Sequence, residues 1–204
     1  MATFDEWLDK NNLKHEPHQK IAVEWCLKRE LTGDIKGGIV ADEMGLGKTI
    51  EILGTMQCNP VPNTLIVLPY SVLEQWGSII TKLFHYAPLV YHGASRKRLT
   101  EEEIQLHPIV ITTYGLISEK KVIQAEGNPL ANIKWHRIIY DEAHHLRNKK
   151  TAVHIGAFRL KTDITWLMTG TPIQNSEKDL YNLFTLLGLK NSVDIKTNTA
   201  NYIR

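Results

Sequence analysis

The chain has 204 residues, and its 24 lysines and arginines against 22 aspartates and glutamates leave a formal net charge of +2. This length allows one large domain or two small ones, and the balanced charge gives no argument for a uniformly basic surface. Two cysteines, Cys26 and Cys58, argue against a disulfide scaffold and fit a reducing, intracellular setting. We expect no membrane span, because no apolar run approaches the necessary ~20 residues, and no signal peptide.

The first 16 residues form a polar lead-in, in which Phe4, Trp7 and Leu8 are spaced to pack on one helical face. Pro17 can open a helix that runs to about Leu31, since proline is tolerated in the first helical turn. A glycine-containing break then precedes a short apolar strand at 38–41. Further runs rich in Val, Ile and Leu predict strands at 65–68, 89–91, 109–112, 138–140 and 165–168.

Amphipathic segments separate these strands. Ser71 is the expected N-cap of a helix over 72–84 with a wide apolar stripe. Ser176 and Asp179 resemble a weak capping box for a later helix, which Gly188 is placed to end. Short buried strands separated by helical lengths predict an α/β fold with a doubly wound, mostly parallel sheet flanked by helices. Ligands of such sheets bind beyond the carboxyl ends of the strands.

The turn after the first strand carries the clearest functional signal, because Gly45 and Gly47 precede Lys48 and Thr49. A glycine-rich turn can aim backbone N–H groups at phosphate oxygens, and the following helix adds the positive end of its dipole. Lys48 would contact the β- and γ-phosphates, and the Thr49 hydroxyl would complete a magnesium shell. The general pattern has a glycine where this chain has Asp42. The alternative is an ordinary turn with a helix-capping lysine.

A second signal lies about 90 residues later, where the strand at 138–140 ends in two adjacent carboxylates, Asp141 and Glu142. Neighbouring side chains at a strand end project in different directions. Asp141 is the predicted magnesium-side acid, and Glu142 the predicted base for a water that attacks the γ-phosphate in line. Taken alone, such a pair is usually a solvated turn. Together with the phosphate loop, it predicts a nucleotide-hydrolysing site.

The two motifs, Asp42-Glu43-Met44-Gly45-Leu46-Gly47-Lys48-Thr49 and Asp141-Glu142-Ala143-His144, resemble the signature of Swi/Snf-type ATPases in helicase superfamily two. The unusual Asp42 is the residue that this family carries. Other segments agree in order and spacing: Pro17-His18-Gln19 is similar to the adenine-reading segment, 68–76 to motif Ia, Tyr91-His92-Gly93 also fits, Thr112-Thr113-Tyr114 is similar to motif Ib and 170–175 to motif III. The resemblance covers about Pro17 to Gly188.

The resemblance implies a RecA-like P-loop NTPase lobe over 17–189 that binds ATP and Mg²⁺. Residues 190–204 would be a tail, or the start of a connection to a second RecA-like lobe that this chain lacks. Lys48, Asp141 and Glu142 would be catalytic, with Thr49 and Asp141 at the metal. His144 and Gln174 would couple nucleotide state to nucleic-acid contact. The implied ATP contacts are Gln19, at the adenine, and Asp42, Glu43, Met44, Gly45, Leu46, Gly47, Lys48 and Thr49.

The family also implies a duplex-DNA partner that the lobe tracks along one strand. Ser71, Thr112 and Thr113 could donate hydroxyls to DNA phosphates, although each alone is more often a helix cap or a strand-edge hydroxyl. Of the basic clusters, 96–98 is more typical of a solvated helix face, and Lys149-Lys150 is the better DNA candidate. The histidines show no metal-ligand spacing, so we expect no structural metal.

The leading hypothesis is the ATP-binding lobe of an ATP-dependent double-stranded DNA translocase, acting near a nucleosome or a polymerase complex. Its ATPase activity would be weak without the second lobe, because that lobe supplies an arginine to the transition state. The alternatives are a lobe of an unwinding RNA or DNA helicase and a non-enzymatic docking module. The expected location is intracellular, in the nucleus or another DNA-containing compartment.

Overall fold

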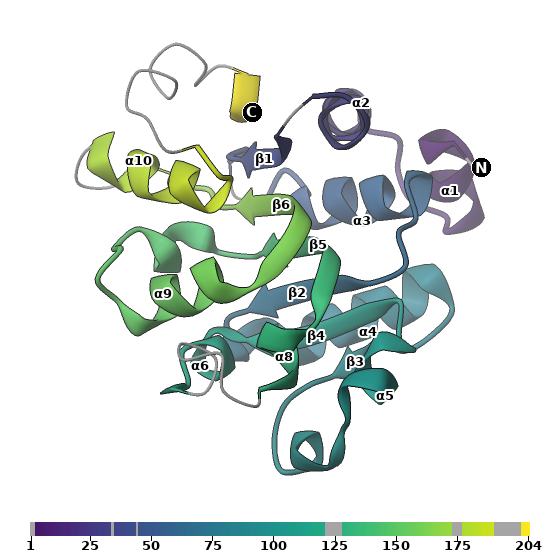
Figure 1. The fold of residues 1–204 in the computed structure, drawn as a ribbon. Helices are drawn as coiled ribbons and strands as arrows, with labels where there is room; N and C mark the ends of the chain where they lie inside the picture. Colours follow the sequence, from purple (N-terminus) through teal and green to yellow (C-terminus); the bar gives the residue numbers. More distant parts are fainter. Residues whose placement is uncertain (1–2, 34, 44, 121–127, 173–176, 190–200) are drawn as a thin grey trace.

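The fold is that of a six-stranded sheet with helices on both faces (Figure 1). The computed structural model describes residues 3–33, 35–43, 45–120, 128–172, 177–189 and 201–204. Every strand pair in the sheet is parallel, in the order β1-β6-β5-β2-β4-β3. The predicted doubly wound α/β architecture is therefore confirmed. The strands are β1 Lys36–Val40, β2 Thr64–Leu68, β3 Leu89–Val90, β4 Ile109–Thr113, β5 Lys134–Tyr140 and β6 Lys161–Met168.

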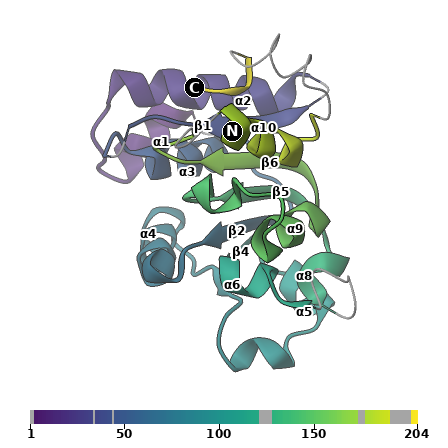
Figure 2. The same cartoon turned by 90° about the vertical axis from the view of Figure 1, so that its left-hand side faces the viewer.

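The central strands are buried on both faces, as their continuous apolar sequences predict. Every residue of β2 and of β4 is buried. One face of the sheet packs on α1 (Phe4–Lys10), α2 (Pro17–Leu31), α3 (Lys48–Cys58) and α4 (Leu73–Phe84). The other face packs on α5 (Glu101–Gln105), α6 (Tyr114–Ile117), α8 (Pro129–Asn132), α9 (Ala152–Arg159) and α10 (Glu177–Leu186). Figure 2 shows the sheet between α3 and α4 on one side and α8 and α9 on the other. No helix within the described ranges has the length and apolarity to cross a membrane.

The structure confirms some of the predicted helix ends and contradicts others. Helix α2 has the predicted limits, and Gly188 follows α10 with φ +89°, where the N–H of Leu189 bonds back to the Phe184 carbonyl at 3.2 Å. The predicted N-cap role of Ser71 is wrong. A 3₁₀ turn, η1 (Tyr70–Val72), precedes α4, so Val72 occupies the cap position and no side chain caps the helix. The predicted cap at Ser176 lies outside the described residues.

Both ends of the described chain pack on the sheet layer. Helix α1 places Phe4, Trp7 and Leu8 in the apolar core with α3, which confirms the predicted helical face of the lead-in. Residues 201–204 return to the outer edge of β1, beside α2 (Figure 1). Ile203 there forms a parallel bridge with Ile39.

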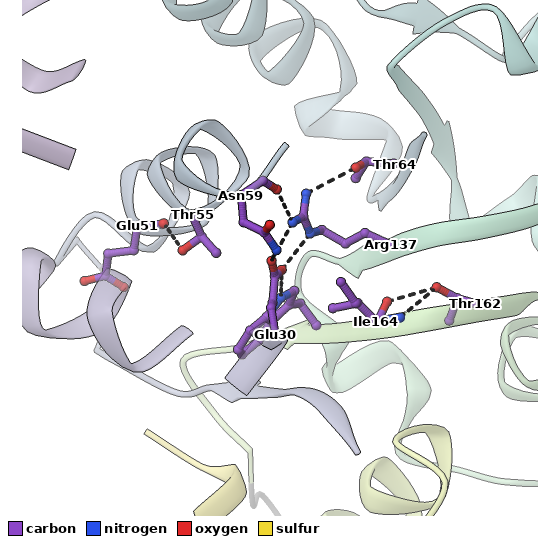
Figure 3. Close-up of polar contacts among 9 residues, drawn as sticks. Glu30, Glu51, Thr55, Asn59, Thr64, Arg137, Thr162 and Ile164 are labelled. Atoms are coloured by element: carbon purple, nitrogen blue, oxygen red, sulfur yellow. Dashed lines mark hydrogen bonds and ion pairs between the residues drawn. The ribbon is translucent and has the colours of Figure 1, made fainter. Parts of the chain in front are cut away.

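A buried ion pair joins α2 to β5. Glu30 and Arg137 have side chains that are 0% and 1% exposed, and they form a bidentate pair with N–O distances of 2.6 and 2.5 Å (Figure 3). Glu30 also accepts hydrogen bonds from Asn59 at 2.7 Å and from the indole of Trp166 at 2.8 Å. Both charged groups therefore have hydrogen-bond partners. A buried ion pair is tolerated only when it has such partners, because burial removes both charges from water.

A second buried carboxyl, that of Glu51 in α3, lacks such partners. The Glu51 side chain is fully buried, and neither carboxyl oxygen accepts a hydrogen bond from a described residue. The dashed line at Glu51 in Figure 3 marks the Thr55 hydroxyl, which donates to the Glu51 backbone carbonyl at 2.8 Å. Burial raises the pKa of Glu51 to about 8, and the nearby charge of Asp42 adds to the increase while Arg204 opposes it. The contrast with Glu30 indicates that Glu51 carries a proton at neutral pH.

Replacing Arg137 with methionine should cost about 3–5 kcal/mol of the free energy of unfolding, because Glu30 would be left as an unpaired buried charge. Urea unfolding measures the loss. Arg98→Met, at an exposed arginine, should change stability by less than about 0.5 kcal/mol. In the double variant with Glu30→Gln the loss should be smaller than the sum of the two single losses, whereas strict additivity would contradict the pairing.

Glu51→Gln should remove a pH dependence of stability. Between the ordinary pKa of 4.5 and the folded value of about 8, the folded chain holds a proton that the unfolded chain has lost, so parent stability falls as pH rises. The stability of the variant relative to the parent should therefore increase from pH 5 to pH 8, on the order of 3 kcal/mol. Unfolding at both pH values measures it, with Glu24→Gln on the exposed face of α2 as the control. A difference that is constant with pH would contradict the burial of a neutral Glu51.

Candidate active site

The glycine-rich turn lies between β1 and α3, at the carboxyl edge of the sheet. Gly45 and Gly47 have φ values of +90° and +91°, a region that favours glycine, and Gly47 is the N-cap of α3. A Cβ at position 47 would also lie 2.2 Å from the side-chain nitrogen of Gln19, so the Gln19 amide would have to move. The turn thus has the backbone conformation that the sequence predicts for a phosphate-binding loop, while Met44 lies outside the described residues.

Lys48 holds the loop in shape. Its ammonium donates to the backbone carbonyls of Asp42 at 2.7 Å and Glu43 at 3.1 Å. Thr49 follows in the first turn of α3 and is partly exposed, as Lys48 is. A compact cation and a hydroxyl therefore stand together where the positive end of the helix dipole emerges.

The segment predicted to contact adenine reaches the same loop. Gln19 is 7% exposed, and its amide donates to the Leu46 carbonyl at 3.1 Å. A ring nitrogen of His18 lies 2.9 Å from the same carbonyl. The start of α2 and the phosphate loop are therefore held as one unit.

The two predicted acids lie at the end of β5, and the structure adds two residues that the sequence analysis did not single out. The Trp76 indole donates to Oδ2 of Asp141 at 2.9 Å, and the Tyr114 hydroxyl donates to the Asp141 carbonyl at 2.6 Å. Burial raises the pKa of Asp141, the Trp76 bond lowers it, and the charge of Glu142 raises it. The sequence analysis places Trp76 in the segment similar to motif Ia but predicts no partner for its indole, although a buried indole N–H needs a polar partner.

Glu142 has an unusual backbone, with φ +50° and ψ +49°. A non-glycine residue in this left-handed region stores about 1–3 kcal/mol of strain and often marks a functional site. The Oε2 of Glu142 lies 3.0 Å from Nδ1 of His144. The two neighbouring acids thus contact different side chains, Trp76 for Asp141 and His144 for Glu142.

A cleft of about 350 Å³ brings the two motifs together. The predicted residues in its lining are Gly45, Gly47, Lys48, Thr49, Asp141 and Glu142, joined by Val72, Gln75, Trp76, Ile79 and Met168. A hydroxyl and a carboxylate oxygen are hard ligands of the kind that Mg²⁺ prefers, and the neighbouring lysine suits a phosphate. The donor set therefore fits a magnesium–triphosphate. No preformed cluster of three or more His, Cys, Asp or Glu side chains suited to a metal occurs in the part of the chain that the structure describes.

The predicted coupling and nucleic-acid residues are more dispersed. Gln174 lies outside the described residues, so its predicted pairing with His144 stays a prediction. Ser71 is exposed in a cleft of about 910 Å³ between α4 and β3. Thr113 is 4% exposed and Thr112 is fully buried, with its hydroxyl donating to the Tyr91 carbonyl at 3.0 Å. Thr112 therefore has no hydroxyl to offer a DNA phosphate in this structure, because the neighbouring strand uses it.

Comparison with solved structures agrees with this fold. The Sulfolobus solfataricus SWI2/SNF2 ATPase core in complex with double-stranded DNA superposes with a TM-score of 0.76 at 23% identity, over 94% of this chain and 44% of that one. The same core domain solved separately gives a TM-score of 0.69 at 26% identity, over 94% of this chain and 38% of that one. The chain therefore has the fold of one part of a larger ATPase core.

Curated relatives are also much longer than this chain. An uncharacterised ATP-dependent helicase of Schizosaccharomyces pombe is 35% identical over 85% of this chain and 19% of its own length. A probable global transactivator of Orgyia pseudotsugata multicapsid polyhedrosis virus is 36% identical over 88% of this chain and 36% of its own, and the S. pombe DNA repair protein rad8 is 31% identical over 74% and 16%. The sequence model of the SNF2-related domain matches residues 18–200. The chain therefore belongs to the SNF2-related family, whose N-terminal ATPase lobe it resembles in fold.

Proposed function

We propose that this chain is the ATP-binding lobe of an ATP-dependent double-stranded DNA translocase. The observation that carries the proposal is the single cleft in which Lys48 and Thr49 face Asp141 and Glu142. Membership of the SNF2-related family supports ATP as the nucleotide. The sequence separation of the two motifs is large, and the parallel sheet is what brings them to one edge.

In this proposal, the backbone of the loop at 45–47 binds the triphosphate and Lys48 turns from its present carbonyl partners to the β- and γ-phosphates. Thr49 and Asp141 would hold Mg²⁺, and the ion would supply positive charge to the phosphate oxygens when bound. Glu142 orients and deprotonates the attacking water. Trp76 fixes the Asp141 carboxylate through its indole N–H.

The proposed partner is duplex DNA, supported by the Sulfolobus neighbour, whose structure contains double-stranded DNA. Of the three predicted hydroxyl donors, Ser71 is exposed while Thr112 and Thr113 are buried, and Ser71 lies in the cleft beside α4. Because the chain spans 16–36% of the length of the first relatives, we place the rest of the motor in a second lobe. An arginine from that lobe would raise hydrolysis by roughly 10³-fold or more, so this chain alone should hydrolyse ATP slowly.

Lys48→Ala should weaken Mg–ATP binding by at least about 100-fold, because the charge aimed at the β- and γ-phosphates is lost. Isothermal titration calorimetry on this chain measures the dissociation constant. Lys97→Ala, at an exposed lysine away from the cleft, is the matched control and should bind like the parent. An unchanged affinity in Lys48→Ala would remove the phosphate-loop assignment.

Glu142→Gln should keep ATP binding and lose hydrolysis by about 10²–10⁴-fold, since the amide cannot accept a proton from the attacking water. Single-turnover hydrolysis in a motor that includes the second lobe, with duplex DNA present, gives the rate. Glu24→Gln, on the exposed face of α2 and outside both clefts, controls for the loss of one surface carboxylate. Parent-like hydrolysis in Glu142→Gln would show that the base is another residue.

A further inference from the structure

The last described residues are tied to the strand that leads into the phosphate loop. The N–H of Arg204 donates to the Ile39 carbonyl at 3.0 Å, and the N–H of Ala41 donates to the Arg204 carbonyl at 2.5 Å. Together with the bridge between Ile203 and Ile39, these bonds extend the sheet beyond β1. The added edge therefore ends at the residue where the phosphate loop begins.

The Arg204 side chain then connects the two parts of the proposed ATP site. Its Nη2 donates to the His18 carbonyl at 2.8 Å, next to Gln19 in the adenine-side segment. Its Nε lies 3.8 Å from Oδ2 of Asp42 in the phosphate loop, with both side chains about one-fifth exposed. One partly buried guanidinium thus spans the start of α2 and the loop after β1, and a bridging role of this kind suits the planar fork of arginine.

The contact between Arg204 and Asp42 affects which cation the Asp42 carboxylate attracts. The Asp42 carboxylate lies beside the Arg204 guanidinium, with Oδ2 3.8 Å from Nε, so Arg204 is a cation placed to balance the charge of Asp42. Lys48 is also close, since its ammonium donates to the Asp42 carbonyl at 2.7 Å, and in the proposed function its charge serves the phosphates. If Arg204 were absent, the Asp42 carboxylate would draw on Lys48 and compete with the nucleotide for it.

The segment that carries Arg204 is firmly seated. The Cζ atom of Arg29 in α2 lies over the Tyr202 ring, 4.2 Å from the ring centroid. The Tyr202 ring also packs edge-to-face on Phe184 of α10, with the two ring centroids 6.4 Å apart. Arg29 in turn donates to the carbonyls of Ile35 and Gly37, at the start of β1. Contacts from α2, α10 and β1 therefore fix the backbone from which Arg204 reaches the site.

We propose that Arg204 is a positioning residue for nucleotide binding, which holds the phosphate loop and the adenine-side segment in register without touching the nucleotide. This inference rests on the proposed ATP-binding function. It assigns a role in the ATP site to a residue that lies about 150 positions after the phosphate loop in sequence and outside both sequence motifs. In this proposal, residues 201–204, which bond to the edge of β1, also support the nucleotide site.

The test compares Mg–ATP and Mg–GTP dissociation constants by calorimetry for the parent, Arg204→Met, Arg204→Lys, Arg98→Met and Lys48→Ala. Arg204→Met should bind ATP about tenfold more weakly, through the lost charge-assisted contacts. It should also lose part of its preference for ATP over GTP, because the His18 carbonyl loses the bond from Arg204 and Gln19 is placed less firmly. Arg204→Lys should recover part of the affinity by keeping a charge near Asp42. Arg98→Met, with an exposed arginine elsewhere, should match the parent.

The outcomes separate the two proposals. If the parent does not bind ATP, or Lys48→Ala binds as tightly as the parent, the proposed function itself fails. If Lys48→Ala loses binding while Arg204→Met keeps the parent affinity and the parent ATP preference, the positioning role is overturned. A loss of affinity in Arg204→Met that Arg204→Lys does not relieve, with the ATP preference unchanged, would also overturn it, because only general loosening of the fold would remain.

Discussion

The bidentate pair of Glu30 and Arg137 is the constraint on which the geometry of the candidate site depends. Glu30 lies near the end of α2, whose first turn carries Gln19, and Arg137 lies in β5, whose end carries Asp141. The same carboxylate accepts a hydrogen bond from Asn59 at the end of α3 (Figure 3). It also accepts one from the indole of Trp166 in β6. Four elements are thus joined at one buried point, so their site-bearing ends are fixed relative to each other. Because the pair costs desolvation, its value lies in this registration rather than in net stability.

The candidate site lies at the ends of these elements that are opposite the Glu30–Arg137 pair, at the carboxyl edge of the parallel sheet. Hydrogen bonds to backbone carbonyls hold the loops of the site in place: Lys48 donates to those of Asp42 and Glu43, and Tyr114 donates to that of Asp141. Glu142 contributes a strained left-handed turn. Lys48 and Thr49 line one cleft with Asp141 and Glu142, and in the proposed function Lys48 exchanges its two carbonyl partners for the phosphates.

Much of this arrangement could be predicted from local sequence signals. Apolar runs separated by helical lengths predicted the parallel sheet, and the glycine pattern before Lys48 predicted the turn that the structure contains. The Ser71 cap failed because capping residues are common in turns, and here a 3₁₀ turn intervenes. Thr112 shows a related limit: its sequence gives a hydroxyl at a strand end, and only the neighbouring chain segment at Tyr91 shows that the hydroxyl is already bonded.

The contacts that sequence reasoning missed are all long-range pairings of single polar side chains. Trp76 with Asp141 and Arg204 with Asp42 join residues far apart in sequence. Neither pairing has a periodicity or a spacing that a pattern could detect. Such pairings depend on how two elements cross, which the fold fixes and the sequence alone does not state.

The most direct test of the account is a crystal structure of this chain with a non-hydrolysable ATP analogue and Mn²⁺, in which anomalous scattering locates the metal. The account predicts the triphosphate on the backbone at 45–47, with the metal between the Thr49 hydroxyl and Asp141. A nucleotide bound elsewhere, or a metal that contacts one motif while the other stays remote, would contradict it.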